Sequence, residues 1–120
     1  MSHVESMKQA TEELAETMKA LSDKPFGGML SAWRRFSAAA HDDGSLSRKS
    51  KELIAIAIAL VKGCERCVSY HVRSAIAAGA TDDEIKEASF VAVIMDGGPA
   101  LAHMSAVLAS IEAHRNEESS

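Results

Sequence analysis

The side chains best suited to chemistry lie between Glu52 and His71. Both cysteines of the 120-residue chain, Cys64 and Cys67, occur in this segment and are three positions apart. His71 follows Cys67 by four positions, and Glu52 precedes a continuous apolar run. Two thiols at this spacing can close a small-loop disulfide, and a neighbouring imidazole can accept or relay a proton. We therefore interpret the segment as a thiol redox centre.

A helix that begins at or near Cys64 would bring both cysteines and His71 to one face, because they occupy positions i, i+3 and i+7. The unpaired N–H groups and the positive dipole at the start of this helix stabilise a thiolate, which favours Cys64 as the attacking thiol. The i+4 spacing between Cys67 and His71 favours Cys67 instead. Tyr70 projects about a quarter-turn away from His71, and we leave it outside the site.

Glu52 is predicted to reach His71 across a turn at Gly63. Glu52 precedes Gly63 by ~16 Å of helix, and His71 follows Cys64 by ~10 Å, at 1.5 Å per residue. If the two helices are antiparallel, the two side chains are offset by only ~6 Å along the axes, so Glu52 could orient His71 and hold its proton. The alternative is that Glu52 only stabilises the first turn of its helix.

Two other interpretations of the cysteines were weighed. Cys64, Cys67, His71 and Glu52 would make four ligands for zinc, or the cysteines could simply be small buried side chains. Structural zinc cysteines usually lie on a turn rather than in a continuing helix. We therefore expect neither a metal nor a cofactor. The alternative to an enzyme is a structural or zinc-stabilised helical oligomer.

The elements that position this segment are predicted to be helices in one domain, residues 1–120. Hydrophobic residues make up 47% of the chain but aromatic residues only 4%, which favours close helix packing over strands. Six helices are expected, with a core over about 26–108 and a polar, frayed tail over 114–120. Their expected ranges are 3–21, Pro25 to about 40, about 47–62, 64 to before Gly79, Thr81 to about 95, and from Pro99 onward.

Helical periodicity also assigns faces to these elements. Met29, Trp33 and Phe36 form an apolar face of the second helix, and the third is apolar nearly all round, so we expect it to be buried on most sides. Apolar seams are also expected on the fifth and sixth helices. They comprise Ala88, Val91, Ala92 and Met95 on the fifth helix, and Leu101, Met104, Leu108 and Ile111 on the sixth. His41 is interpreted as a surface residue that compensates a helix dipole, and His103 as packed or partner-facing.

Charge and hydropathy exclude some partners. The net charge is −4 with no basic stripe, which argues against nucleic acid. The longest strictly apolar run, Leu53 to Val61, is far shorter than the ~20 residues that span a bilayer. The N-terminal segment has acidic residues and no apolar signal core. We expect a cytoplasmic protein with no membrane partner. In that compartment a Cys-x-x-Cys pair is more often redox-active or metal-binding than structural.

The chain resembles the AhpD-like alkylhydroperoxidases of the carboxymuconolactone decarboxylase family over roughly Phe26 to Leu108. The resemblance rests on four motifs together: Leu46-Ser47-x-Lys49-x-Lys51-Glu52-Leu53-Ile54-Ala55, Cys64-x-x-Cys67-x-x-x-His71, Ala78-Gly79-Ala80-Thr81-x-x-Glu84-Ile85 and Gly97-Gly98-Pro99-Ala100. It implies an all-α fold, a homo-oligomer that is commonly a trimer or hexamer, and a peroxiredoxin-type oxidoreductase that reduces alkyl hydroperoxides.

What the resemblance implies for the site is a division of roles. Cys67 would attack the peroxide, Cys64 would close the redox disulfide, and His71 with Glu52 would relay protons. A lipoyl or thioredoxin-type dithiol protein would be the reductant. The best-known branch has a second histidine directly before the attacking cysteine, where this chain has Arg66, whose charge could favour a thiolate. The decarboxylase branch lacks the cysteine pair. The alternative activity is thiol-disulfide exchange without peroxide reduction.

Overall fold

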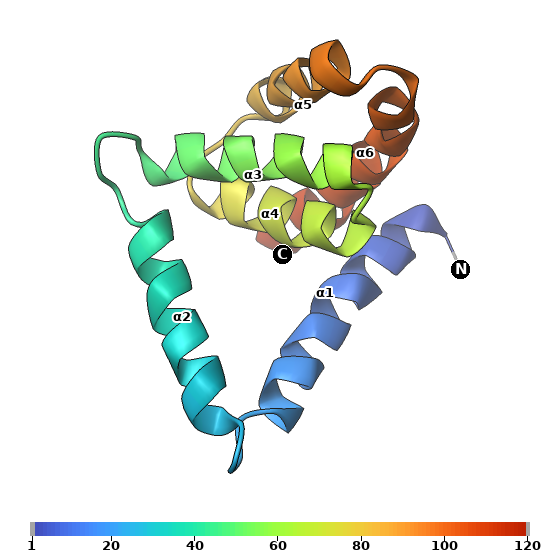
Figure 1. Cartoon of the computed structure of the whole chain (residues 1–120). Coiled ribbons are helices and arrows are strands. Elements are labelled where there is room, and N and C mark those ends of the chain that lie inside the picture. Colours follow the sequence, from blue (N-terminus) through green and yellow to red (C-terminus); the bar gives the residue numbers. More distant parts are fainter. Residues whose placement is uncertain (1, 120) are drawn as a thin grey trace.

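The structure is a computed structural model, and it describes residues 2–119. Within this range it consists of six helices, as predicted, and no strand. They are α1 (His3–Ala20), α2 (Gly27–His41), α3 (Arg48–Lys62), α4 (Glu65–Ala77), α5 (Asp82–Asp96) and α6 (Gly98–Ser119). Helices α3 to α6 pack together as a bundle, while α1 and α2 diverge from a turn as two arms of a V (Figure 1).

The ends of the helices follow from local side-chain chemistry. Ser47 caps α3 by accepting a hydrogen bond from the backbone N–H of Ser50, and Thr81 forms a capping box with Glu84 at the start of α5. These caps satisfy N–H groups that have no partner within their helix. Gly63 ends α3 in the left-handed conformation, with φ of 68°. The second helix begins at Gly27 rather than at Pro25.

The core lies where α3, α4, α5 and α6 meet. Its largest members are almost fully excluded from solvent, and burial of such side chains is the main stabilising contribution to the fold. They are Ile56, Leu60, Val68, Val72, Ile85 and Val107. The first half of α1 covers this bundle through Met7 and Ala10 and packs against α6 and α4.

Several apolar faces that were expected to be buried are exposed. Helix α2 buries none of its side chains, and Ile54 and Ile58 on α3 are about half exposed. On α5, Met95 is 82% exposed. The predicted seams were therefore wrong in part, because the bundle covers only one side of each of these helices. The predicted seam of α6 is also only partly buried. Met104 and Ile111 are buried, whereas Leu101 and Leu108 are exposed.

The predicted frayed tail over 114–120 was also wrong within the described residues. Helix α6 continues to Ser119, and His114 is 3% exposed. No glycine or proline follows Pro99, so nothing in the sequence ends the helix earlier. His114 finds two polar partners, Ser69 and Glu117, which allows it to be buried.

No helix within the described residues is both long and apolar enough to cross a bilayer.

Candidate functional site

The two cysteines are joined by a disulfide at the N-terminus of α4. Their Cα atoms are 5.2 Å apart. Cys64 is the N-cap of the helix, and its sulfur accepts a hydrogen bond from the backbone N–H of Cys67 at 3.2 Å. Cys67 is the more exposed of the two, with Cys64 partly buried. The pair therefore combines an accessible sulfur with one held at the positive end of a helix dipole.

Glu52 and His71 meet across the turn at Gly63. Nδ1 of His71 lies 2.8 Å from Oε2 of Glu52. Glu52 comes from the first turns of α3 and is 1% exposed, whereas the side chain of His71 on α4 is 21% exposed. A buried carboxylate needs such a partner because removing its charge from water is costly. The predicted approach of these two residues thus occurs in the structure.

His41 contacts the other oxygen of the same carboxylate. Its Nε2 atom lies 3.3 Å from Oε1 of Glu52, and its ring stacks on that of His71 with centroids 5.8 Å apart and planes 20° apart. Nδ1 of His41 lies 2.7 Å from the carbonyl oxygen of Ser37. The interpretation of His41 as a surface residue was therefore wrong in part, because its side chain is only 25% exposed and contacts Glu52. Its position in the last turn of α2, beside the Ser37 carbonyl, agrees with the predicted compensation of the helix dipole. Helix α2 ends at His41, and the turn into α3 places the imidazole against Glu52.

A cleft of about 910 Å³ covers this site. Its lining residues come from the arms α1 and α2, from the first residue of α3 and from the start of α4. Cys64, Cys67 and His71 line it together with Tyr70, whose ring lies edge-on to that of His71 at 5.1 Å. Tyr70, which the sequence analysis left out, thus belongs to the cleft. The rest of the wall is largely apolar and includes Leu14, Met18, Trp33 and Phe36.

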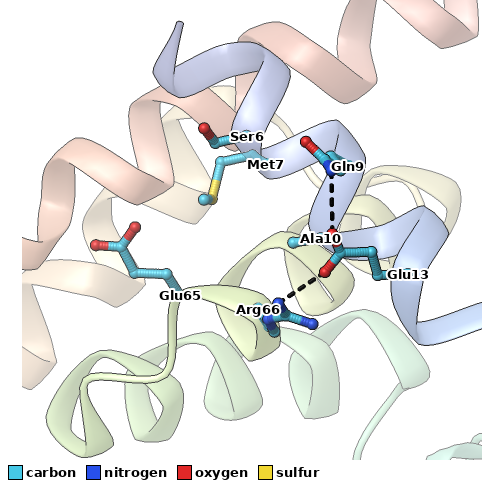
Figure 2. A pocket seen from close by; sticks show the side chains of 7 residues that line it. All are labelled: Ser6, Met7, Gln9, Ala10, Glu13, Glu65 and Arg66. Carbon is cyan, nitrogen blue, oxygen red and sulfur yellow. Dashed lines mark hydrogen bonds and ion pairs between the residues drawn. The ribbon is translucent and has the colours of Figure 1, made fainter. Parts of the chain in front are cut away.

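Arg66 is engaged by α1. Its guanidinium lies 2.7 Å from Oε2 of Glu13, and its side chain is 65% exposed. Figure 2 shows this ion pair beside a smaller hollow of about 340 Å³ between α1 and the start of α4, with Gln9 hydrogen-bonded to the same Glu13. The sequence raised the possibility that the charge of Arg66 stabilises a cysteine thiolate. Because Glu13 partly neutralises that charge, any such stabilisation is weaker than an unpaired arginine would give.

The four-ligand zinc site considered from the sequence is not assembled in this structure. Cys64 and Cys67 are bonded to each other, and a disulfide sulfur is not a thiolate ligand. The groups that do converge are His41, Glu52 and His71, whose potential ligand atoms all lie within 4.8 Å of one another.

The fold and the site together define an all-α protein with a Cys-x-x-Cys disulfide at the N-terminus of one helix. A buried glutamate, Glu52, contacts a partly buried histidine, His71, of the same helix. The model of the "Carboxymuconolactone decarboxylase family" matches residues 28–110, so the chain belongs to this family. The resemblance inferred from the motifs is thereby confirmed.

Relatives and solved structures agree with this assignment. The chain is 37% identical over 108 residues to "Uncharacterized protein 4 in cox locus" of Paracoccus denitrificans, covering 89% of this chain and 92% of the relative. A family protein from Legionella pneumophila superimposes with a TM-score of 0.80 at 29% identity, covering 92% of this chain and 96% of that one. Similarity to the alkyl hydroperoxide reductase AhpD of Anaeromyxobacter sp. (strain K) is 37% over 49 residues, covering 41% of this chain and 26% of that protein.

Proposed function

We propose that this protein is a thiol-dependent hydroperoxide reductase of the AhpD-like, peroxiredoxin type. The observation that carries the proposal is that Cys64, Cys67 and His71 line one cleft, with the buried Glu52 in contact with His71 behind it. Glu52 is placed to orient His71, and His71 is placed one helical turn beyond Cys67 to accept its proton. The apolar wall of the cleft suits an organic hydroperoxide.

The reaction starts from the reduced dithiol. The thiolate of Cys67 attacks the terminal oxygen of ROOH, which breaks the O–O bond and gives a sulfenic acid and RO⁻; protonation of RO⁻ releases ROH. The thiol of Cys64 then attacks the sulfenic sulfur, which forms the disulfide and releases water. An external dithiol, from a lipoyl or thioredoxin-type protein, reduces the disulfide and is itself oxidised to a disulfide.

Other members of the family give this proposal limited support. The Anaeromyxobacter proteins that share a 49-residue segment are named alkyl hydroperoxide reductase AhpD. The description of a Thermotoga maritima family protein, 25% identical with a TM-score of 0.78, suggests a part in the antioxidative response. A cytoplasmic location, where dithiol reductants are maintained, belongs to the same proposal.

Self-association is also part of the proposal. Large apolar side chains are exposed on α2 and α5, among them Phe36 at 65% and Ile94 at 80%. Exposed apolar surface of this kind is typical of protein–protein contacts, and we propose a homo-oligomer, either a trimer or a hexamer. Light scattering of the 12.8 kDa chain after size-exclusion chromatography measures its mass, and a monomer at all concentrations contradicts this part.

A second candidate function is thiol-disulfide exchange without peroxide reduction. It is favoured by Arg66, which replaces the second histidine of the best-known branch and is paired with Glu13. Cys64, whose sulfur already accepts the helix N-terminal N–H of Cys67, would be the attacking thiol in this case.

The intact mass of the reduced protein, before and after one equivalent of an organic hydroperoxide, tests the proposal. We expect a loss of two hydrogens that a dithiol reverses. Cys67→Ser should stop peroxide consumption altogether, while Cys64→Ser should still consume one equivalent and retain a sulfenic acid. An unchanged mass with thiols that react with iodoacetamide would reject peroxide reduction and favour disulfide exchange. Loss of activity in Cys64→Ser alone would reverse the assigned roles.

A further inference from the structure

The contacts of His41 bring an unprotonated ring nitrogen close to the carboxylate of Glu52. A carbonyl oxygen only accepts hydrogen bonds, so the 2.7 Å contact with the Ser37 carbonyl requires a proton on Nδ1 of His41. In the neutral ring, Nε2 then carries a lone pair, and this lone pair faces Oε1 of Glu52 at 3.3 Å. Two acceptors cannot satisfy each other, so either a further proton or a cation must lie between them.

His71 contributes a second imidazole to the same carboxylate. Its Nδ1 atom lies 2.8 Å from Oε2 of Glu52, and its ring is nearly parallel to that of His41. Potential ligand atoms of the three residues lie within 4.8 Å of one another. Within residues 2–119, the ion-pair partners of the buried Glu52 are these two histidines and no lysine or arginine. No lysine or arginine in this range therefore neutralises the Glu52 carboxylate in place of a bound cation.

We propose that His41, Glu52 and His71 form a binding site for a divalent transition metal ion with the ligand preference of Zn²⁺. Two imidazoles and one carboxylate suit zinc and its neighbours, whereas Mg²⁺ and Ca²⁺ prefer oxygen ligands only. Tetrahedral bonds of ~2.0–2.1 Å place neighbouring ligand atoms about 3.3 Å apart. Nε2 of His41 lies 3.3 Å from Oε1 of Glu52, whereas Nδ1 of His71, which lies 2.8 Å from Oε2, would have to move apart slightly to admit the ion.

The surroundings fit a ligand set of this kind. The Ser37 carbonyl fixes the ring of His41 with Nε2 toward Glu52, which is the arrangement by which outer hydrogen bonds orient metal-binding histidines. Both histidines also line the cleft, so a fourth position would be open to water or a ligand from that side. The three ligands come from α2, α3 and α4, so a bound ion would tie α2 to the bundle.

This site differs from a cysteine zinc site and does not depend on the proposed peroxide chemistry. The ligands are complete while Cys64 and Cys67 are joined as a disulfide. The metal and the proton relay would use the same atoms of Glu52 and His71, so an occupied site would exclude the relay.

The test is a titration of the metal-free, disulfide-bonded protein with Zn²⁺ against a chelating indicator, followed by Co²⁺ spectroscopy. We expect one ion per chain, and the comparatively intense visible d–d bands of a tetrahedral Co²⁺ site without sulfur-to-cobalt charge transfer. His41→Gln should weaken Zn²⁺ binding roughly 100-fold or more, because changes in outer hydrogen bonds alone typically cost 10–100-fold. The control is His3→Gln, since His3 also faces a carboxylate, Glu65 at 3.2 Å, but on the exposed surface; its binding should match that of the unchanged protein.

A second readout separates binding from a folding defect. Zn²⁺ should raise the unfolding temperature of the unchanged protein and of His3→Gln, but not that of His41→Gln or Glu52→Gln. Far-ultraviolet circular dichroism establishes that each variant is folded before titration. The proposal is overturned if the unchanged protein binds no Zn²⁺ at millimolar concentration, or if folded His41→Gln and Glu52→Gln bind it as tightly as the unchanged protein. Peroxide consumption is tested separately, by the mass measurement on the metal-free protein, in which Glu52 and His71 are available to the relay.

Discussion

The hydroxyl oxygen of Ser69 on α4 lies 3.0 Å from Nε2 of His114 on α6, and both side chains are buried. The same oxygen contacts the hydroxyl of Thr11 at 2.8 Å and donates to the carbonyl of Met7 at 2.5 Å. Three helices are thus joined through one hydroxyl. Burial opposes ionisation of Glu117, but the hydrogen bond and charge of His114, together with the charges of Arg73 and Lys8, lower the pKa of this carboxyl below its usual value.

His114→Ala should lower the free energy of unfolding by about 2–3 kcal/mol, because it removes the buried imidazole that contacts both Ser69 and Glu117 and opens a cavity. Urea denaturation followed by circular dichroism measures the change. His103→Ala is the matched control, since His103 is on the same helix with a side chain 36% exposed, and its effect should stay within about 0.5 kcal/mol. Equal effects of the two substitutions would contradict a stabilising role for the buried network.

Gly63→Ala should destabilise the turn that connects α3 to the disulfide. Gly63 has φ of 68°, and an added Cβ would lie 3.3 Å from Nε2 of His103. A left-handed conformation costs a residue with a side chain about 1–2 kcal/mol, so we expect a loss of this size in the free energy of unfolding of the oxidised protein. Gly98→Ala serves as control, because Gly98 has no atom within 4 Å of the added Cβ. A Gly63→Ala variant as stable as Gly98→Ala would contradict the strain argument.

The ion pair between Lys49 and Glu84 should make stability depend on pH in the acid range. The hydrogen bond from Lys49, followed by that from the backbone of Thr81, lowers the pKa of Glu84 from 4.5. Because the pKa in the folded state is depressed, the contribution is present above pH 4.5 and is lost as the pH falls through the folded-state pKa. Lys49→Met should therefore lose less stability than the unchanged protein between pH 6 and pH 3, measured by thermal unfolding. Parallel curves would contradict this prediction.

The features that could be predicted from the sequence depend on short-range chemistry. Ser47, Gly63 and Thr81 each determine a helix end through their own side chain or backbone, so the limits of α3 and α5 followed from composition. Glu52 and His71 flank one tight turn, and the fixed rise of a helix was sufficient to bring them together. The all-α fold was predicted from composition and helical periodicity, and the family from the resemblance of four short motifs.

The features that were missed depend on how distant helices meet. His41 reaches Glu52 only because the segment after α2 returns the chain to the start of α3, and nothing in the sequence around His41 specifies that path. Hydrophobic periodicity predicted apolar faces on α2 and α5 but could not determine whether this chain or another molecule covers them, and Trp33 and Met95 remain exposed. His114 was misjudged because its partner Ser69 lies 45 residues away in the sequence.

Glu52→Gln should slow oxidation of the reduced protein by an organic hydroperoxide if Glu52 positions His71 as a proton acceptor. We expect a reduction of roughly 10-fold or more in the single-turnover rate, and ~100-fold or more for His71→Gln, because general acid–base catalysis typically contributes 10²–10⁴-fold. Glu84→Gln is the control, since this carboxylate faces Lys49 away from the disulfide. The pH–rate profile should change shape in Glu52→Gln and keep its shape in Glu84→Gln, which a loss of folded protein alone would not produce. An unchanged rate and profile in a folded Glu52→Gln variant would reject the relay and leave its carboxylate as a structural partner of the two histidines.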